Sequence, residues 1–189
     1  MTDNGEDVTQ RTIASAVKVI LEALGEDVNR EGLLKTPARV ADALIELSTP
    51  QGFEFTTFNA EGMSEMIVEA PISFHSLCEH HMMSFFGKAA VGYIPNGKIV
   101  GLSKLPRAVE YCSKGLQNQE RITLNIADMV EKALKPLGVG VILRGRHMCM
   151  EARGVHAAGV FSTTSRLTGV MMEPAVRAEF LRLVGGSLE

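Results

Sequence analysis

Residues 88–102 read KAAVGYIPNGKIVGL and hold the clearest indication of the fold. Two short β-favouring runs, 88–94 and 98–102, flank Pro95-Asn96-Gly97, a combination typical of a hairpin turn. A third run of the same kind, MIVEAPISF, covers residues 66–74. Strands joined by such short turns pair in an antiparallel manner. We therefore expect an antiparallel sheet in the middle of the chain.

Further strands and helices follow this region. The pattern predicts strands over 138–150 and 159–172, and helices over 105–114, 118–135 and the segment PAVRAEFLRLVGG that starts at Pro174. Segregated helices and antiparallel strands indicate an α+β protein.

The N-terminal part of the chain is predicted to be helical. Apolar residues recur at helical spacing from Thr9 to Leu24. KTPARVADALIEL predicts a second helix, with Thr36 as its N-cap and Pro37 in its first turn. Residues 48–65 are rich in turn formers and read as a loop. We expect an N-terminal helical region over 1–65 and one catalytic unit over 66–189.

Composition excludes several classes of protein. The 189 residues suffice for one sizeable core, and no apolar run is long enough to span a bilayer. The polar, acidic start MTDNGEDVTQ does not resemble a secretory signal, so we expect a cytoplasmic protein. A net charge of −3 gives no general attraction to nucleic acid or to an anionic membrane. Three cysteines, an odd number, argue against a disulfide framework.

The stretch SLCEHHMM, residues 76–83, carries the densest group of metal-binding side chains. Cys78 and His81 have the spacing of a tight ligand loop, and Cys149 ends the predicted strand 138–150 on the same face as His147. Zinc prefers such thiolate and imidazole ligands. On spacing alone a four-ligand structural site, completed by His80 or His147, is as well supported as a three-ligand catalytic site. We interpret Cys112 as a buried thiol outside the site.

Two more segments suggest recognition of an anion and of a purine. GLSKLPR places Ser103, Lys104 and Arg107 at the start of a helix, whose N-terminal amides favour anions, although a capped helix with a solvated basic face explains the same residues. Glu120 can accept hydrogen bonds from both N1–H and the exocyclic amine of guanine. Arg153 shares the alternation of His147, provided that the strand continues.

These motifs together resemble the GTP cyclohydrolase I family. The resemblance covers about 150 residues, from REGLLKTPARVA (30–41) through SLCEHHMMSFFGKAAVGYIP, GLSKLPRAVE, QNQERIT, HMCMEARGV and STTS to RAEFL. It implies the tunnelling fold: an antiparallel four-stranded sheet with two long helices on one side, assembled into a decamer of two pentamers with active sites between subunits. It further implies opening of the imidazole ring of GTP, release of formate and rearrangement to dihydroneopterin triphosphate, the first step of folate, pterin or 7-deazaguanine biosynthesis.

The resemblance also assigns roles to individual residues. It implies zinc ligation by Cys78, His81 and Cys149, and hence an open, catalytic metal. His147 would protonate N7 of the purine, with His80 as its alternate or as a carrier of later protons. The remaining assignments are a guanine-binding pair, Gln119 and Glu120; ribose-triphosphate contacts from Ser103, Lys104, Arg107 and Arg153, with Ser103 near the sugar during the rearrangement; and a triphosphate-binding Arg39 contributed by a neighbouring subunit.

The sequence departs from the family pattern at several positions near the site. Asp42 stands where some members carry a triphosphate-binding lysine. The other departures are Ser84, Ala90, Val160 and Phe161. These positions flank the site and supply no metal ligand, so we expect them to affect the affinity for the substrate more than the reaction itself. Two alternatives follow: a catalytically weak, zinc-stabilised relative that binds a purine, a pterin or a regulatory partner, and a tunnelling-fold enzyme of deazaguanine metabolism that does not need this zinc set.

Overall fold

A computed structural model describes residues 3–189, with side chains from residue 8 onward. The chain divides into two compact units, one ending at Thr49 and one spanning Pro50–Glu189. None of the described helices combines the length and the apolar character needed to cross a membrane.

The first unit consists of two helices, α1 (Asp3–Ala23) and α2 (Thr36–Ser48). They share a small contact in which Ala41 is fully buried, and Gln10 Nε2 donates to Asp42 Oδ1 at 3.2 Å. Pro37 lies in the first turn of α2 as predicted, but the predicted cap is wrong. Lys35 occupies the N-cap, and the Thr36 hydroxyl donates backward to Gly32 O, a local bond that competes with capping.

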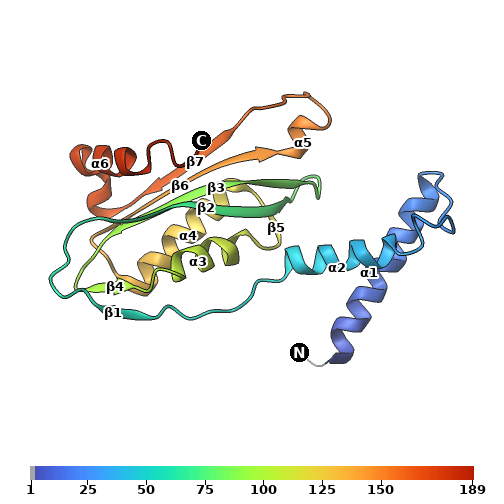
Figure 1. Cartoon of the computed structure of the whole chain (residues 1–189), viewed down its shortest axis with the longest axis horizontal. Helices are drawn as coiled ribbons and strands as arrows, with labels where there is room; N and C mark the ends of the chain where they lie inside the picture. The colour runs from blue at the N-terminus through green and yellow to red at the C-terminus, as the bar shows by residue number, and fades with distance from the viewer. Residues whose placement is uncertain (1–2) are drawn as a thin grey trace. The chain divides into compact units, whose positions relative to one another are not determined.

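The second unit is built on a five-stranded sheet in the order β5-β2-β3-β6-β7 (Figure 1). Its four long strands are antiparallel: β2 (Ile67–Cys78), β3 (Ser84–Ile94), β6 (Gly138–His147) and β7 (Ser162–Leu167). The two-residue β5 (Leu116–Gln117) runs parallel to the end of β2. The antiparallel sheet and the α+β class agree with the prediction.

The predicted hairpin between 88–94 and 98–102 does not form. After Gly97, whose φ is +75°, the chain leaves the main sheet, and β4 (Lys98–Val100) pairs with β1 (Thr57–Asn59) in a separate two-stranded sheet. The Val100 amide, which would otherwise need a ladder partner, donates to Tyr93 Oη at 3.0 Å. The segment 48–65, predicted to be a loop, therefore contains a short strand.

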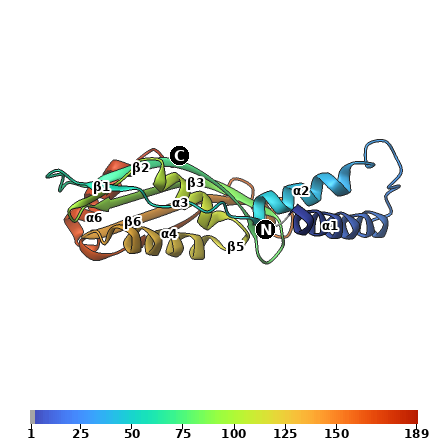
Figure 2. The same cartoon turned by 90° about the horizontal axis from the view of Figure 1, so that it is seen from below.

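Helices cover both faces of the main sheet. On one face lie α3 (Lys104–Ser113) and α4 (Gln119–Leu134), which run next to each other in both views (Figures 1 and 2). Their apolar residues join those of the sheet in the larger core; its members include Leu105, Val109, Ile122, Ile126, Phe74, Phe85, Val91 and Leu143. The smaller core on the opposite face centres on Phe180 of α6 (Pro174–Val184). Alternation along β3 and β6 separates the two cores.

Phe180 explains two glycines of the sheet. A Cβ at Gly92 or at Gly140 would lie 2.8 Å from the Phe180 ring, too close for any real contact. The bare backbone at these positions lets the aromatic ring of α6 lie directly on the sheet.

The C-terminal strands are shorter than predicted. The segment 138–150 is extended only to His147, and Met148–Glu151 forms the helical turn α5, which Arg146 Nε closes by donating to Glu151 Oε1 at 2.8 Å. The segment 159–172 is extended only over β7 and ends in a 3-10 turn, Gly169–Met172. There Gly169 takes a φ of +51° and packs against the Leu137 carbonyl, where a side chain would not fit.

Candidate metal centre and its surroundings

Three potential metal ligands converge at one end of the sheet. Cys78 ends β2, His81 lies in the turn to β3, and Cys149 lies in α5 directly after β6. Because β3 pairs with both β2 and β6, it brings these two strand ends together. The ligand atoms of the three residues all lie within 4.8 Å of one another. The prediction placed Cys149 on a continuing strand, and α5 instead delivers it.

The spacing of these atoms suits a tetrahedral zinc ion. Cys78 Sγ lies 3.9 Å from Cys149 Sγ and 3.8 Å from His81 Nδ1. Ligands at typical zinc distances and tetrahedral angles would be about 3.8 Å apart for two sulfurs and about 3.6 Å for sulfur and nitrogen. A disulfide would need about 2.05 Å, and both cysteines are free thiols. The donor set and its geometry therefore fit zinc.

The electrostatic environment of Cys149 also favours a cation between the two cysteines. Burial, and next the neighbouring Cys78, raise the pKa of the Cys149 thiol. Two thiolates this close repel each other, and a cation between them would reverse that effect. The strand that was predicted to continue to Arg153 ends at His147. Arg153 nevertheless lies close to one of the three candidate ligands, with its Nη1 3.2 Å from His81 Nε2.

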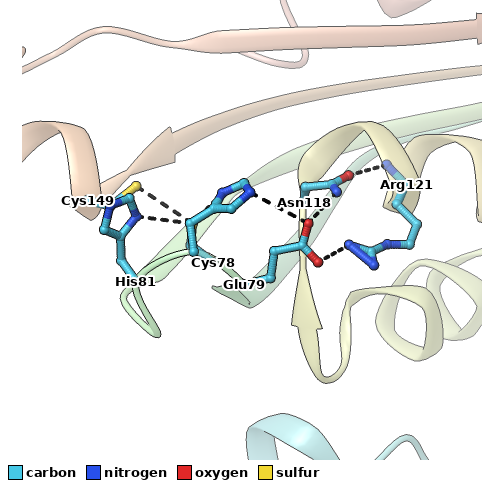
Figure 3. A network of polar contacts seen from close by, with 7 residues as sticks. Cys78, Glu79, His81, Asn118, Arg121 and Cys149 are labelled. Carbon is cyan, nitrogen blue, oxygen red and sulfur yellow. Dashed lines mark hydrogen bonds and ion pairs between the residues drawn. The ribbon is translucent and has the colours of Figure 1, made fainter.

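A polar network connects the start of α4 to the ligand loop, the segment 78–83 that joins β2 to β3 and holds Cys78 and His81 (Figure 3). Glu79 accepts a hydrogen bond from Asn118 Nδ2 at 2.8 Å and forms an ion pair with Arg121. Asn118 is the N-cap of α4, and its Oδ1 accepts from the Arg121 amide at 2.8 Å. The exposed His80 lies at the edge of this network, with Nδ1 3.8 Å from Cys78 Sγ and Nε2 3.8 Å from Glu79 Oε1.

His147, the last residue of β6, is fixed from two sides. Its ring stacks on Phe85, with centroids 4.6 Å apart and 7° between the planes, and its Nε2 lies 3.0 Å from Gln119 Oε1. Burial lowers the pKa of His147, and the negative charge of Glu120 raises it by a smaller amount. Gln119 itself is only 1% exposed.

The predicted anion-binding and base-binding residues of this group lie on three helices. Ser103 is the N-cap of α3, Lys104 and Arg107 lie in its first turn, and the exposed Glu120 lies in the first turn of α4. Arg107 lines a cavity of about 460 Å³ between β2 and α3, together with His75, Glu110 and Lys114. Arg39 belongs to α2 of the first unit. Cys112, interpreted as a buried thiol, is indeed 4% exposed, and burial raises its pKa to about 12.

Sequence reasoning missed the residues that hold the site in place. Glu79 stood inside the quoted ligand stretch, but its partners Asn118 and Arg121 lie about 40 positions further along the chain. The predicted helix 118–135 begins at Asn118, and an Asn at the start of a helix is an ordinary N-cap signal. Phe85 carried no signal, because stacking on His147 depends on the register of β3 against β6.

The curled antiparallel sheet, the helices α3 and α4 that cover one face, and the Cys–His–Cys group at the strand ends define a tunnelling-fold protein with a group of residues that could hold a metal. The family model described as GTP cyclohydrolase I matches residues 13–185. The chain therefore belongs to the GTP cyclohydrolase I family.

Curated relatives agree with the family model. A GTP cyclohydrolase 1 of Porphyromonas gingivalis is 47% identical over 171 residues, covering 88% of this chain and 89% of the relative. One from Chlorobium chlorochromatii is 46% identical, covering 97% and 82%, and one from Aquifex aeolicus is 45% identical, covering 95% and 98%. Among solved structures, an archaeosine synthase QueF-Like in the apo form matches 57% of this chain and 94% of that chain, with 17% identity and a TM-score of 0.43.

Proposed function

We propose that this chain is a GTP cyclohydrolase, which opens the imidazole ring of GTP, releases formate and forms 7,8-dihydroneopterin triphosphate. The observation that carries this function is the match of residues 13–185 to the family, combined with the convergence of Cys78, His81 and Cys149, the last of which lies two residues after His147. A family match alone would also fit an inactive relative, whereas a set of metal ligands with a partly buried imidazole nearby in the chain is what hydrolysis of a purine ring needs.

Zinc is the metal we assign to Cys78, His81 and Cys149, on the fit of donor types and distances. Zinc held there would lower the pKa of a bound water to about 7 and so supply hydroxide at neutral pH. Cys78 and Cys149 are both buried, and their sulfur atoms lie 3.9 Å apart.

The guanine base would be held by Glu120. Its carboxylate is exposed at the start of α4, one turn from the Asn118 cap, where two oxygens can accept N1–H and the exocyclic amine of guanine. Adenine lacks this pair of donors, so the same carboxylate would exclude ATP.

The proton donor to N7 of the purine would be His147. Its ring is held by Phe85 and Gln119, and burial lowers its pKa, so the imidazolium gives up its proton more easily once it has formed. His80, exposed and close to Cys78, is available for later proton transfers. Ser103 would lie near the sugar during its rearrangement.

The triphosphate would be bound by a set of cationic residues and a helix N-terminus. We assign Lys104, Arg107 and Arg153 to this role, with Arg39 supplied by a neighbouring subunit. A chain with a net charge of −3 needs such a local concentration of positive charge to hold a triphosphate.

A homo-oligomer, a decamer of two pentamers, is the assembly we propose. In the described residues the main sheet ends at β7 on one side and, before residue 77, at β2 on the other, so both edges offer unpaired backbone groups. Light scattering tests this assembly directly. Three free thiols fit a reducing compartment, which supports a cytoplasmic location.

The experiment that tests the function is incubation of metal-analysed protein with GTP, following formate and the pterin chromophore, with and without a chelator. We expect both products at equal amounts and loss of both on chelation. A zinc-loaded protein that leaves GTP intact would instead identify the chain as the non-catalytic relative, and Asp42 and Phe161 would be the first residues to restore toward the family pattern.

A further inference from the structure

The Gln119 side chain is buried and has hydrogen-bond partners at both ends of its amide. Its amide nitrogen has three acceptors within hydrogen-bond distance, Leu143 O at 3.2 Å, Ser162 O at 3.0 Å and Thr164 Oγ1 at 3.1 Å, which share its two hydrogens. Its amide oxygen lies 3.0 Å from His147 Nε2. At 1% exposure and with partners at both ends, this amide is buried within the protein and is not presented to a nucleotide.

The orientation of this amide follows from its partners. Two of the three groups around the nitrogen are backbone carbonyls, which only accept hydrogen bonds. A flipped amide would place its oxygen against both carbonyl oxygens, at a cost in electrostatic repulsion and unmade bonds. The NH₂ group must therefore face Leu143 and Ser162, and the oxygen must face His147.

Two threonines add a directed ring of hydrogen bonds. The Thr123 hydroxyl donates to the Gln119 backbone oxygen at 2.8 Å, so it must accept from Thr164, at 2.7 Å. Thr164 Oγ1 has then donated its only proton and accepts from Gln119 Nε2. The ring is consistent with one amide orientation only.

The backbone of β6 leaves room for this arrangement. A Cβ at Gly145 would lie 2.8 Å from Gln119 Oε1, and Phe74 closes the other side at 3.1 Å. Glycine at this position therefore allows the amide oxygen to reach His147 across the strand.

From these contacts we infer that Gln119 is a positioning residue that fixes the ring plane and the tautomer of His147. An amide oxygen can only accept, so Nε2 of the neutral imidazole carries the hydrogen and Nδ1 holds the lone pair. Phe85 fixes the plane of the His147 ring by stacking on its face. Nδ1 is thus the nitrogen that exchanges a proton with the substrate, and Gln119 acts through His147 and not on guanine. This inference rests on the proposed function for its kinetic consequence but not for the tautomer.

The first test measures the tautomer in the zinc-loaded wild-type protein without substrate. Solid-state NMR of ¹⁵N-histidine-labelled protein distinguishes protonated from unprotonated ring nitrogens, and His147→Asn identifies the His147 signals by their loss. We expect the Nε2–H form. An Nδ1–H form overturns the inference, whether or not the protein turns over GTP.

The second test uses Gln119→Met, which keeps the chain length but removes the amide, with Gln117→Met as the matched control. The Gln117 amide donates to Lys114 O and does not reach His147. For Gln119→Met we expect kcat to fall about 10- to 100-fold, the scale on which loss of an orienting hydrogen bond reduces activity. We expect KM for GTP to stay within about twofold. The NMR spectrum of His147 should then show a mixture of the two tautomers. The control should keep kcat within about twofold.

Three outcomes of this second test, which combines kinetics with the NMR spectrum, overturn the inference. They are an unchanged kcat, an unchanged tautomer, and a raised KM with lost discrimination between GTP and ITP at full kcat, which would make Gln119 a base reader. Gly145→Ala, which pushes on the amide oxygen from the other side, should reproduce the loss of kcat if Gln119→Met fails to fold. An inactive wild type contradicts the proposed function, while the wild-type spectrum still decides the tautomer.

Discussion

The Glu79 carboxylate accepts a hydrogen bond from Asn118 Nδ2 at 2.8 Å and so fastens the ligand loop to the N-cap of α4. The loop carries Cys78 and His81, and the first turn of α4 carries Glu120. This carboxylate, together with the bond from the Glu79 amide to Gln117 O at 2.9 Å, holds the candidate metal ligands close to the helix that carries the proposed base reader.

Replacing Glu79 with Ala should weaken zinc binding about 10- to 100-fold, because supporting contacts around ligands contribute on that scale. The chain should still fold, since the ion pair with Arg121 is partly exposed. Competition with a chromophoric chelator measures the affinity. Glu54→Ala, which changes an exposed carboxylate, is the control, and equal affinities for the two variants would contradict the role of Glu79.

Cys149→Ala should lose stoichiometric zinc, whereas Cys112→Ala should retain it. The first change removes one of three ligands within 4.8 Å of one another, and the second removes a buried thiol outside that group. Metal analysis of the purified variants checks both. Zinc retained in Cys149→Ala would show that another side chain, His80 or His147, completes the site.

His147→Ala should retain zinc and lose turnover of GTP. The imidazole bonds to Gln119 and not to the ligand group, so its removal should leave the metal site intact. Metal analysis and formate release on the same sample measure the two properties. Loss of zinc in this variant would make His147 a ligand and remove its assignment as proton donor.

Glu120→Gln should lower kcat/KM for GTP about 10- to 100-fold, the scale of a lost hydrogen bond to a charged group. The amide of glutamine offers one acceptor where guanine presents two donors, so selectivity against ATP should fall as well. Competition between the two nucleotides measures selectivity. Undiminished discrimination against ATP would rule out Glu120 as the base reader.

Cys112 should make the protein less stable at alkaline pH. Burial raises the pKa of the folded thiol to about 12, while an unfolded thiol ionises near about 8.5. Between these values the folded state holds one more proton, so this group lowers the free energy of unfolding by about 1.4 kcal/mol per pH unit as pH rises. Denaturant titrations from pH 8 to pH 11 should give a shallower decline for Cys112→Ala, and parallel curves would contradict the expectation.

Local patterns in the sequence were sufficient for most elements of the fold. The helices α3 and α4 and the strands β2 and β3 follow from side-chain periodicity and from nearby Pro and Gly residues, which act within a few positions of the chain. The spacing of Cys78 and His81 is local in the same sense, because one tight turn connects them. The end of β6 was mispredicted because the Arg146–Glu151 pair, and not β propensity, decides it.

The tertiary structure decided which segments far apart in the sequence contact one another. By itself the sequence determined the α+β class, the types of the candidate ligands and a helix that starts near residue 118. Only the register of β3 between β2 and β6 brings Cys149 to Cys78 and stacks His147 on Phe85. Such contacts join residues up to 71 positions apart, and burial and hydrogen-bond saturation select them only when the whole sheet is in place.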